Sequence, residues 1–187
     1  GGVAVAELLL VDETPAGQVS ESPPPALGMA FRPLVSGTVT RLYFYRPALD
    51  TNPAHSILLK LWRGDTVGAG TELASGTILT NPVVPGWNSV AVNAPVVAGT
   101  PYKVAANPTQ FYGFTGARFA AGSPPSLPAG LLLAIQDNTN PLGGWVIRNG
   151  TFLAGSGVYP ADNTGTFNAT WYGLGVEFEP DVRPVIV

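Results

Sequence analysis

The sequence predicts an all-β fold, an antiparallel β-sandwich of jelly-roll type with an N-terminal arm. Gly (23 residues) and Pro (19 residues) are spread along all 187 positions and leave almost no window long enough for a regular helix. Short apolar runs recur between these turn residues from Leu27 onward, a pattern typical of sandwiches and barrels. Hydrophobic residues make up 45% of the chain, which is enough for one sizeable core. We therefore expect a single sandwich domain.

The N-terminal region is expected to form the arm. An apolar run from Val3 to Val11 precedes a polar, Pro-rich connection that ends in Ser22-Pro23-Pro24-Pro25. A connection of this composition favours an extended conformation. We predict that residues 1–26 lie outside the core, as an arm that docks its apolar run on a neighbouring subunit, and that residues 27–187 form the sandwich.

The apolar runs of the sandwich region are expected to form its strands. They are Leu27–Leu34, Thr38–Arg46, Ser56–Trp62, Leu73–Thr80, Trp87–Asn93, Tyr102–Ala106, Phe111–Phe114, Trp145–Arg148 and Trp171–Glu179. The stretch from Gly116 to Gly144 is less regular. We expect it to be a long excursion from the sandwich that carries a function or a contact, as long loops in compact domains usually do.

The alternation of side chains along a strand predicts which of them face the core. In the last run the inward face carries Tyr172, Leu174, Val176 and Phe178, and the outward face carries Trp171, Gly173, Gly175, Glu177 and Glu179. In Thr38–Arg46 the alternation holds only if a bulge lies near Thr40-Arg41. The other inward residues are then Leu42, Phe44, Ile57, Leu59 and Leu61, and the other outward aromatic residues are Tyr43, Tyr45 and Trp62.

Composition excludes several classes of function. The chain has no Cys and one His, His55, which excludes a thiolate zinc site, a Cys nucleophile and a multi-histidine metal site. With 9 Lys+Arg against 12 Asp+Glu, it lacks the clustered basic face that nucleic-acid binding needs. No apolar stretch approaches the roughly 20 residues that span a bilayer, and no signal peptide is recognisable. We expect neither a nucleic-acid nor a membrane partner, and a structural, loop-bonded role for His55.

Two groups of oxygen-bearing residues are weaker candidates for chemistry. Glu177 and Glu179 alternate on one strand face, but nothing supplies the apolar pocket that raises the pKa of a glycosidase acid. We therefore predict a solvated face and no enzyme. Asp137-Asn138-Thr139-Asn140 and Asp162-Asn163 offer oxygen ligands to Ca²⁺, although Asx residues in such loops are more often turn formers. We predict no cofactor, with Ca²⁺ as the alternative.

The outward aromatic side chains are the main candidates for a site. They are Trp171, Trp62, Tyr43 and Tyr45. Such rings suit a sugar platform, because sugars present flat apolar faces with polar groups beside them. They suit equally well an interface with another subunit, or a surface covered by the excursion at 116–144. Trp87 and Trp145 follow Gly at the start of a strand and are expected to plug the ends of the core.

Several motifs carry a resemblance to a known family. They include Leu27-Gly28-Met29-Ala30-Phe31-Arg32, Gly86-Trp87-Asn88-Ser89-Val90 and Phe167-Asn168-Ala169-Thr170-Trp171-Tyr172. Over about Leu27 to Phe178 the sequence resembles a bacterial β-sandwich domain of unknown function that recurs in extracellular proteins, beside immunoglobulin-like repeats and carbohydrate-active modules. The resemblance implies an all-β fold, a surface location and no catalysis, and it gives no ligand. The sequence also resembles domains of phage head-surface and tail proteins.

These observations predict a non-catalytic surface structural or adhesion domain of a phage virion. The domain would form an oligomer through the arm, and a virion protein reaches the cell exterior without a signal peptide. The seven Arg against two Lys fit a phage of a high-GC host. The alternative is a carbohydrate-binding accessory module of a secreted bacterial protein, which would bind cell-surface glycan.

Overall fold

The computed structural model describes residues 6–66, 69–78, 85–121, 131–139, 147–161 and 169–181. The described residues form strands, turns and loops, and none of them is helical. A membrane-spanning helix is accordingly not found in this part of the chain. The predicted all-β sandwich is confirmed.

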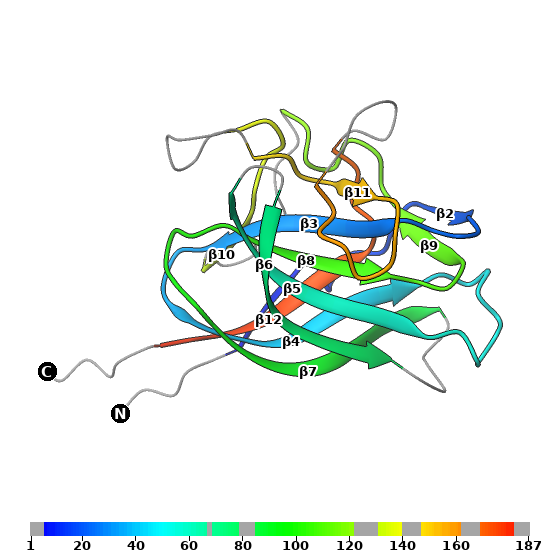
Figure 1. Cartoon of the computed structure of the whole chain (residues 1–187), viewed down its shortest axis with the longest axis horizontal. Helices are drawn as coiled ribbons and strands as arrows, with labels where there is room; N and C mark the ends of the chain where they lie inside the picture. The colour runs from blue at the N-terminus through cyan, green and yellow to red at the C-terminus, as the bar shows by residue number, and fades with distance from the viewer. Residues whose placement is uncertain are drawn as a thin grey trace, which may run out of the picture.

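Two antiparallel sheets make up the sandwich (Figure 1). The smaller sheet has the order β1 (Glu7–Leu9), β12 (Leu174–Pro180), β4 (Gly37–Arg46) and β7 (Gly86–Val96). The larger has the order β10 (Leu132–Ala134), β3 (Ala26–Pro33), β8 (Tyr102–Asn107), β5 (Ile57–Thr66) and β6 (Ala69–Ile78), and β11 (Thr151–Leu153) also pairs with β3. A separate ribbon of β2 (Gly17–Ser20) and β9 (Phe111–Phe114) lies at one end of the sandwich (Figure 1).

The order of the strands along the chain is jelly-roll-like. Strands β3, β4 and β5 lie in the larger, the smaller and again the larger sheet, and β6, β7 and β8 repeat this succession. Each crossing of the chain turns the apolar side of a strand toward the space between the sheets. The core therefore lies in that space and draws residues from both sheets.

Strand alternation located the core correctly in the regular strands. All the residues predicted to face inward in β4, β5 and β12 are buried, together with Tyr172 just before β12. The pairing of β4 with β7 shifts register between Val39 and Arg41, so the predicted bulge is confirmed. The bulge keeps Val39 and Leu42 on the same inward face although they are three residues apart, and both are 0% exposed.

The prediction that residues 1–26 lie outside the core is wrong at Leu9, Leu10 and Ala26, which are buried, whereas residues 11–25 are exposed or partly exposed; residues 1–5 are not among those described. Strand β1 pairs with β12, and the Leu9 and Leu10 side chains, 1% and 0% exposed, belong to the core. Strand β2 pairs with β9. The apolar run completes the smaller sheet of its own chain because β12 offers it an unpaired edge and a space for its leucines.

The segment between β1 and β2 crosses the outer side of β12. Its course requires glycine at Gly175, where a Cβ atom would come within 2.7 Å of the Leu9 carbonyl oxygen and of Val11. Arg118 fixes the same segment through two hydrogen bonds to the Glu13 carboxylate, of 3.1 and 2.7 Å. Gly175 is thus a point of close approach between the backbones of β12 and the N-terminal segment.

The stretch at 116–144 contributes to the sandwich in part, which corrects the expectation of an excursion. Strand β10 pairs with β3, and Phe119 is 2% exposed in the core. Residues 122–130 and 140–146, including Trp145, lie outside the described part, as does the Asp162-Asn163 pair.

Candidate functional site

Two of the four predicted site residues come together on the outer face of the smaller sheet. Tyr43 and Tyr45 of β4 are partly exposed and both contact Trp87 of the neighbouring strand β7. The ring centroids of Tyr45 and Trp87 are 5.5 Å apart, those of Tyr43 and Trp87 are 6.3 Å apart, and both pairs are edge-on. We call these three residues the aromatic face. Trp87 packs against the core, as expected, and the pairing of β4 with β7, which the sequence does not state, also places it beside the two tyrosines.

Polar groups surround the aromatic face. Arg41 Nη1 donates a 3.0 Å hydrogen bond to Ser89 Oγ, and Ser89 lies opposite Tyr43 in the pairing of the two strands. Burial and the nearby Glu177 carboxylate raise the pKa of the Tyr43 hydroxyl, so it stays protonated at neutral pH. Trp87 Nε1 donates to the Glu13 carbonyl oxygen at 3.1 Å. The arrangement offers rings and hydrogen-bonding groups side by side.

Trp171 does not belong to this face, and its predicted outward position is wrong. Its side chain is 0% exposed, and its Nε1 donates to the Leu174 carbonyl oxygen at 2.8 Å. The cause is Gly173, whose φ of +70° interrupts the alternation, so that the strand begins only at Leu174. The ring of Trp171 packs under Trp87, with centroids 6.0 Å apart, and supports the aromatic face from within.

Trp62 lies on the outer side of the larger sheet, away from the aromatic face. Its ring packs edge-on against Tyr159 at 5.5 Å, and Lys60 Nζ lies 5.5 Å from the ring centroid. Asn107 Oδ1 accepts a 2.7 Å hydrogen bond from the Gly157 amide and so fixes the segment that carries Tyr159. Tyr159 and Lys60 therefore cover part of the ring, and Trp62 stays partly exposed.

Lys103 is a buried charge that sequence reasoning missed. It is 4% exposed on the same side of the larger sheet, where its Nζ donates to the Pro160 carbonyl oxygen at 2.8 Å and lies 4.5 Å from the Tyr159 ring centroid. Burial lowers the pKa of Lys103 to about 7, while the Asp137 carboxylate acts in the opposite direction. The sequence carried one signal of this burial: Lys103 lies between apolar neighbours, in a strand that is buried on both sides.

His55 has the structural role expected of it. Its Nδ1 is 2.7 Å from Asp50 Oδ1, and Arg46 Nε is 3.0 Å from Asp50 Oδ2. Arg46 is 0% exposed and also donates to the backbone carbonyl oxygens of His55 and Asn52. The three side chains hold together the loop between β4 and β5.

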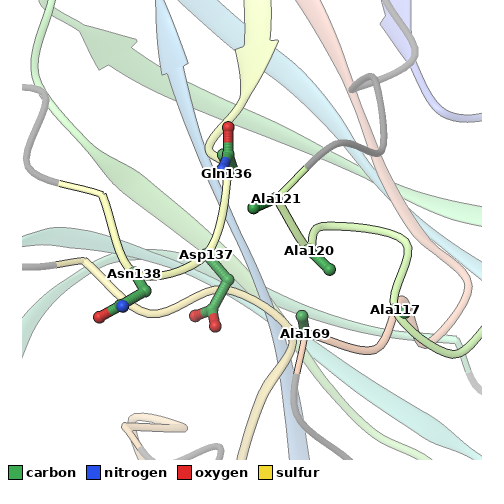
Figure 2. Close-up of a pocket in the computed structure, with 7 residues that line it drawn as sticks. All are labelled: Ala117, Ala120, Ala121, Gln136, Asp137, Asn138 and Ala169. Carbon is green, nitrogen blue, oxygen red and sulfur yellow. The ribbon is translucent and has the colours of Figure 1, made fainter.

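Asp137 and Asn138 of the oxygen-rich stretch border a recess of about 410 Å³ (Figure 2). Asp137 and Asn138 lie on one side, and alanines, among them Ala120 and Ala169, lie on the other (Figure 2). Asp137 Oδ1 accepts from the Asn149 amide at 2.9 Å, and Asn138 Oδ1 accepts from Arg148 Nη1 at 3.0 Å. Within the described residues no three His, Cys, Asp or Glu residues are grouped as metal ligands would be. Protein donors already use these oxygens.

Asn149 fastens the same region to β3. Its side chain is 0% exposed, accepts from the Ala30 amide at 2.8 Å and donates to the carbonyl oxygens of Ala30 and Ile135 at 2.9 and 2.6 Å. The Asn149-Gly150-Thr151 sequon is therefore inaccessible to glycosylation in the folded chain.

Comparison with solved structures finds a similar fold in a clostridial cysteine protease, Cwp84, determined after propeptide cleavage. The TM-score is 0.54 at 9% sequence identity, and the similarity covers 94% of this chain and 40% of that chain. At this identity the similarity concerns the fold alone, and the chain spans well under half of the protease's length. No curated protein matches the sequence.

A family model matches residues 12–172, which takes in most of the predicted arm as well as the sandwich. The match agrees with the resemblance to a domain of unknown function. It covers far more than half of the sequence, and the chain belongs to the family described as Domain of unknown function (DUF4082).

Proposed function

We propose that this domain is a non-catalytic surface module that adheres to glycan through the aromatic face. The observation that carries the proposal is the cluster of Tyr43, Tyr45 and Trp87, three partly exposed rings bordered by hydrogen-bonding groups. A pyranose ring has an apolar face edged by hydroxyl groups, and this face matches rings that have Ser89 and Arg41 beside them. Trp171 beneath Trp87 holds the platform rigid, which lowers the entropic cost of binding.

The carboxylates of the last strand support a binding role rather than a catalytic one. Glu177 Oε1 accepts a 2.7 Å hydrogen bond from Thr40 Oγ1, and Glu179 is exposed. A Glu177→Gln variant should bind glycan as the parent protein does. Because the proposed role is non-catalytic, we expect no enzymatic turnover in either protein.

The test is binding of the isolated full chain to an array of bacterial and host glycans. Tyr45→Ala should weaken the best interaction about tenfold or more, because ring truncation in a small site removes a large share of the contact. Tyr45→Phe is the matched control, since it keeps the ring, and it should retain binding. Failure of the parent chain to bind any glycan, or equal binding by the Tyr45→Ala variant, would exclude the proposed role of this face.

A second candidate is a structural subunit of a phage virion, in which the aromatic face would contact a neighbouring subunit. The observation that favours it is the excess of Arg over Lys, as in proteins of high-GC phages. Arm docking no longer supports it, because the described part of the apolar run of the predicted arm packs in the sandwich of its own chain. A stable symmetric oligomer in solution that Tyr45→Ala dissociates would favour this candidate over glycan binding.

A further inference from the structure

A second recess, separate from the aromatic face, lies where the β2–β9 ribbon meets β3 and β11. Its volume is about 530 Å³, within the range of small-molecule sites. Four aromatic side chains line it: Tyr112 and Phe114 of β9, Phe152 of β11, and Tyr172. No pattern in the sequence groups these rings, because they come from three separate segments of the chain.

The rings form a fixed wall. Tyr112 and Tyr172 are 7% and 3% exposed and meet edge-on, with ring centroids 5.9 Å apart. Phe114 and Phe152 are partly buried beside them. A ligand that enters the recess would find an aromatic lining that is already in place, so little ordering accompanies binding.

Glu21 is the single charged residue among the described residues that line the recess. It is exposed at the rim, and one of its oxygens, Oε1, accepts the Tyr112 hydroxyl at 3.3 Å. Burial raises the pKa of both tyrosines, in Tyr112 with a further contribution from Glu21, so both hydroxyls stay neutral at pH 7. The recess therefore combines aromatic rings with one carboxylate.

We propose that this recess binds an organic ammonium group, such as the trimethylammonium of a choline ester. Aromatic faces attract a cation through the ring quadrupole, and the apolar lining accepts the methyl groups of an alkylated ammonium better than a hydrated inorganic ion. The Glu21 carboxylate supplies the opposite charge at the entrance. An anion is disfavoured by the same charge, and a neutral apolar molecule would gain nothing from Glu21.

The test is a calorimetric or NMR titration of the full chain with choline and with its uncharged carbon isostere, dimethylbutanol. Choline should bind at least about tenfold more tightly than the isostere, because only choline gains the interactions with the rings and the carboxylate. Chemical-shift changes should occur at Tyr112, Phe152 and their neighbours.

Two variants sharpen the result. Glu21→Gln should weaken choline binding several-fold, leave binding of the isostere unchanged and leave the melting temperature unchanged, since Glu21 is exposed. Glu179→Gln, which removes an exposed carboxylate that does not line the recess, is the matched control and should bind choline normally. Equal affinity for choline and isostere, no binding of choline at millimolar concentration, or an unaffected Glu21→Gln variant would each overturn the proposal.

Discussion

The outer faces of the two sheets both carry aromatic residues, but different segments of the chain lie over them and cover them to different extents. On the smaller sheet the N-terminal segment crosses at Gly175 and leaves Tyr43, Tyr45 and Trp87 partly exposed. On the larger sheet Tyr159 and Pro160 cover Lys103 almost completely, while Tyr159 also packs against Trp62, which stays partly exposed. Strand alternation identifies both faces as outward. What decides whether an outward side chain is a candidate for binding is the course of a distant segment over it.

The largest effect is expected at Trp171, whose ring packs beneath Trp87 of the aromatic face. Trp171→Ala should lower the free energy of unfolding by about 3–5 kcal/mol, because it leaves a cavity and removes the hydrogen bond to Leu174. Chemical denaturation measures this. A cost below about 1 kcal/mol would mean that Trp171 is not a core residue.

Lys103, buried on the outer side of the larger sheet, should make stability depend on pH. Because the pKa of Lys103 is lowered to about 7 in the folded chain, the unfolded chain binds one more proton between about pH 7 and pH 10. The free energy of unfolding should therefore rise with pH across this window, by roughly 2–3 kcal/mol between pH 7 and pH 9.5, and level off below pH 7. Denaturation curves at several pH values measure the slope.

Lys103→Met is the control for this slope. Methionine fills the same space without a titrating group, so the pH dependence should largely disappear. A slope that persists unchanged in Lys103→Met would assign it to another group.

The N-terminal segment over Gly175 and the Tyr159 segment over Gly70 should differ in how much stability is lost when a methyl group is placed beneath them. Gly175→Ala should cost about 1–3 kcal/mol, because its Cβ would meet the Leu9 carbonyl oxygen in a backbone that pairing holds in place. Gly70→Ala should cost less, because its Cβ would meet the Tyr159 side-chain ring. Thermal melts of the two variants compare them, and a reversed ranking would show that the N-terminal segment is the looser cover.

The smallest effect on stability is expected at the aromatic face itself. Tyr45→Ala should cost about 1 kcal/mol or less, since the ring is partly exposed and edge-on to Trp87. A cost as large as that of Trp171→Ala would class Tyr45 as a core residue and remove it from the binding surface.

The fold was predictable where local pattern and tertiary environment agree. In β5 the alternation of Ile57, Leu59 and Leu61 places each one in the core, and the slip between Val39 and Leu42 is enough to locate a bulge. The prediction failed at Trp171 because one glycine with a positive φ changes the phase, and sequence does not reveal which glycines adopt it.

Only part of the candidate site could be predicted from the sequence. Tyr43 and Tyr45 follow from alternation alone, whereas Trp87 becomes their neighbour only through the pairing of β4 with β7. The destination of the N-terminal run was not predictable, because Leu9 and Leu10 would be equally apolar in an arm and in a core. Long-range pairing decides such cases, and neither composition nor spacing encodes it.

The pairing of β1 with β12 has a consequence for solubility. β12 has seven residues and is bonded to β4 on one side, so β1 is what occupies its other edge. An uncovered edge of this kind is a template for strands of other molecules. Removal of residues 1–11 should therefore promote edge-to-edge aggregation through β12. Thioflavin fluorescence should rise as the truncated chain is concentrated, and more than it does for the full chain.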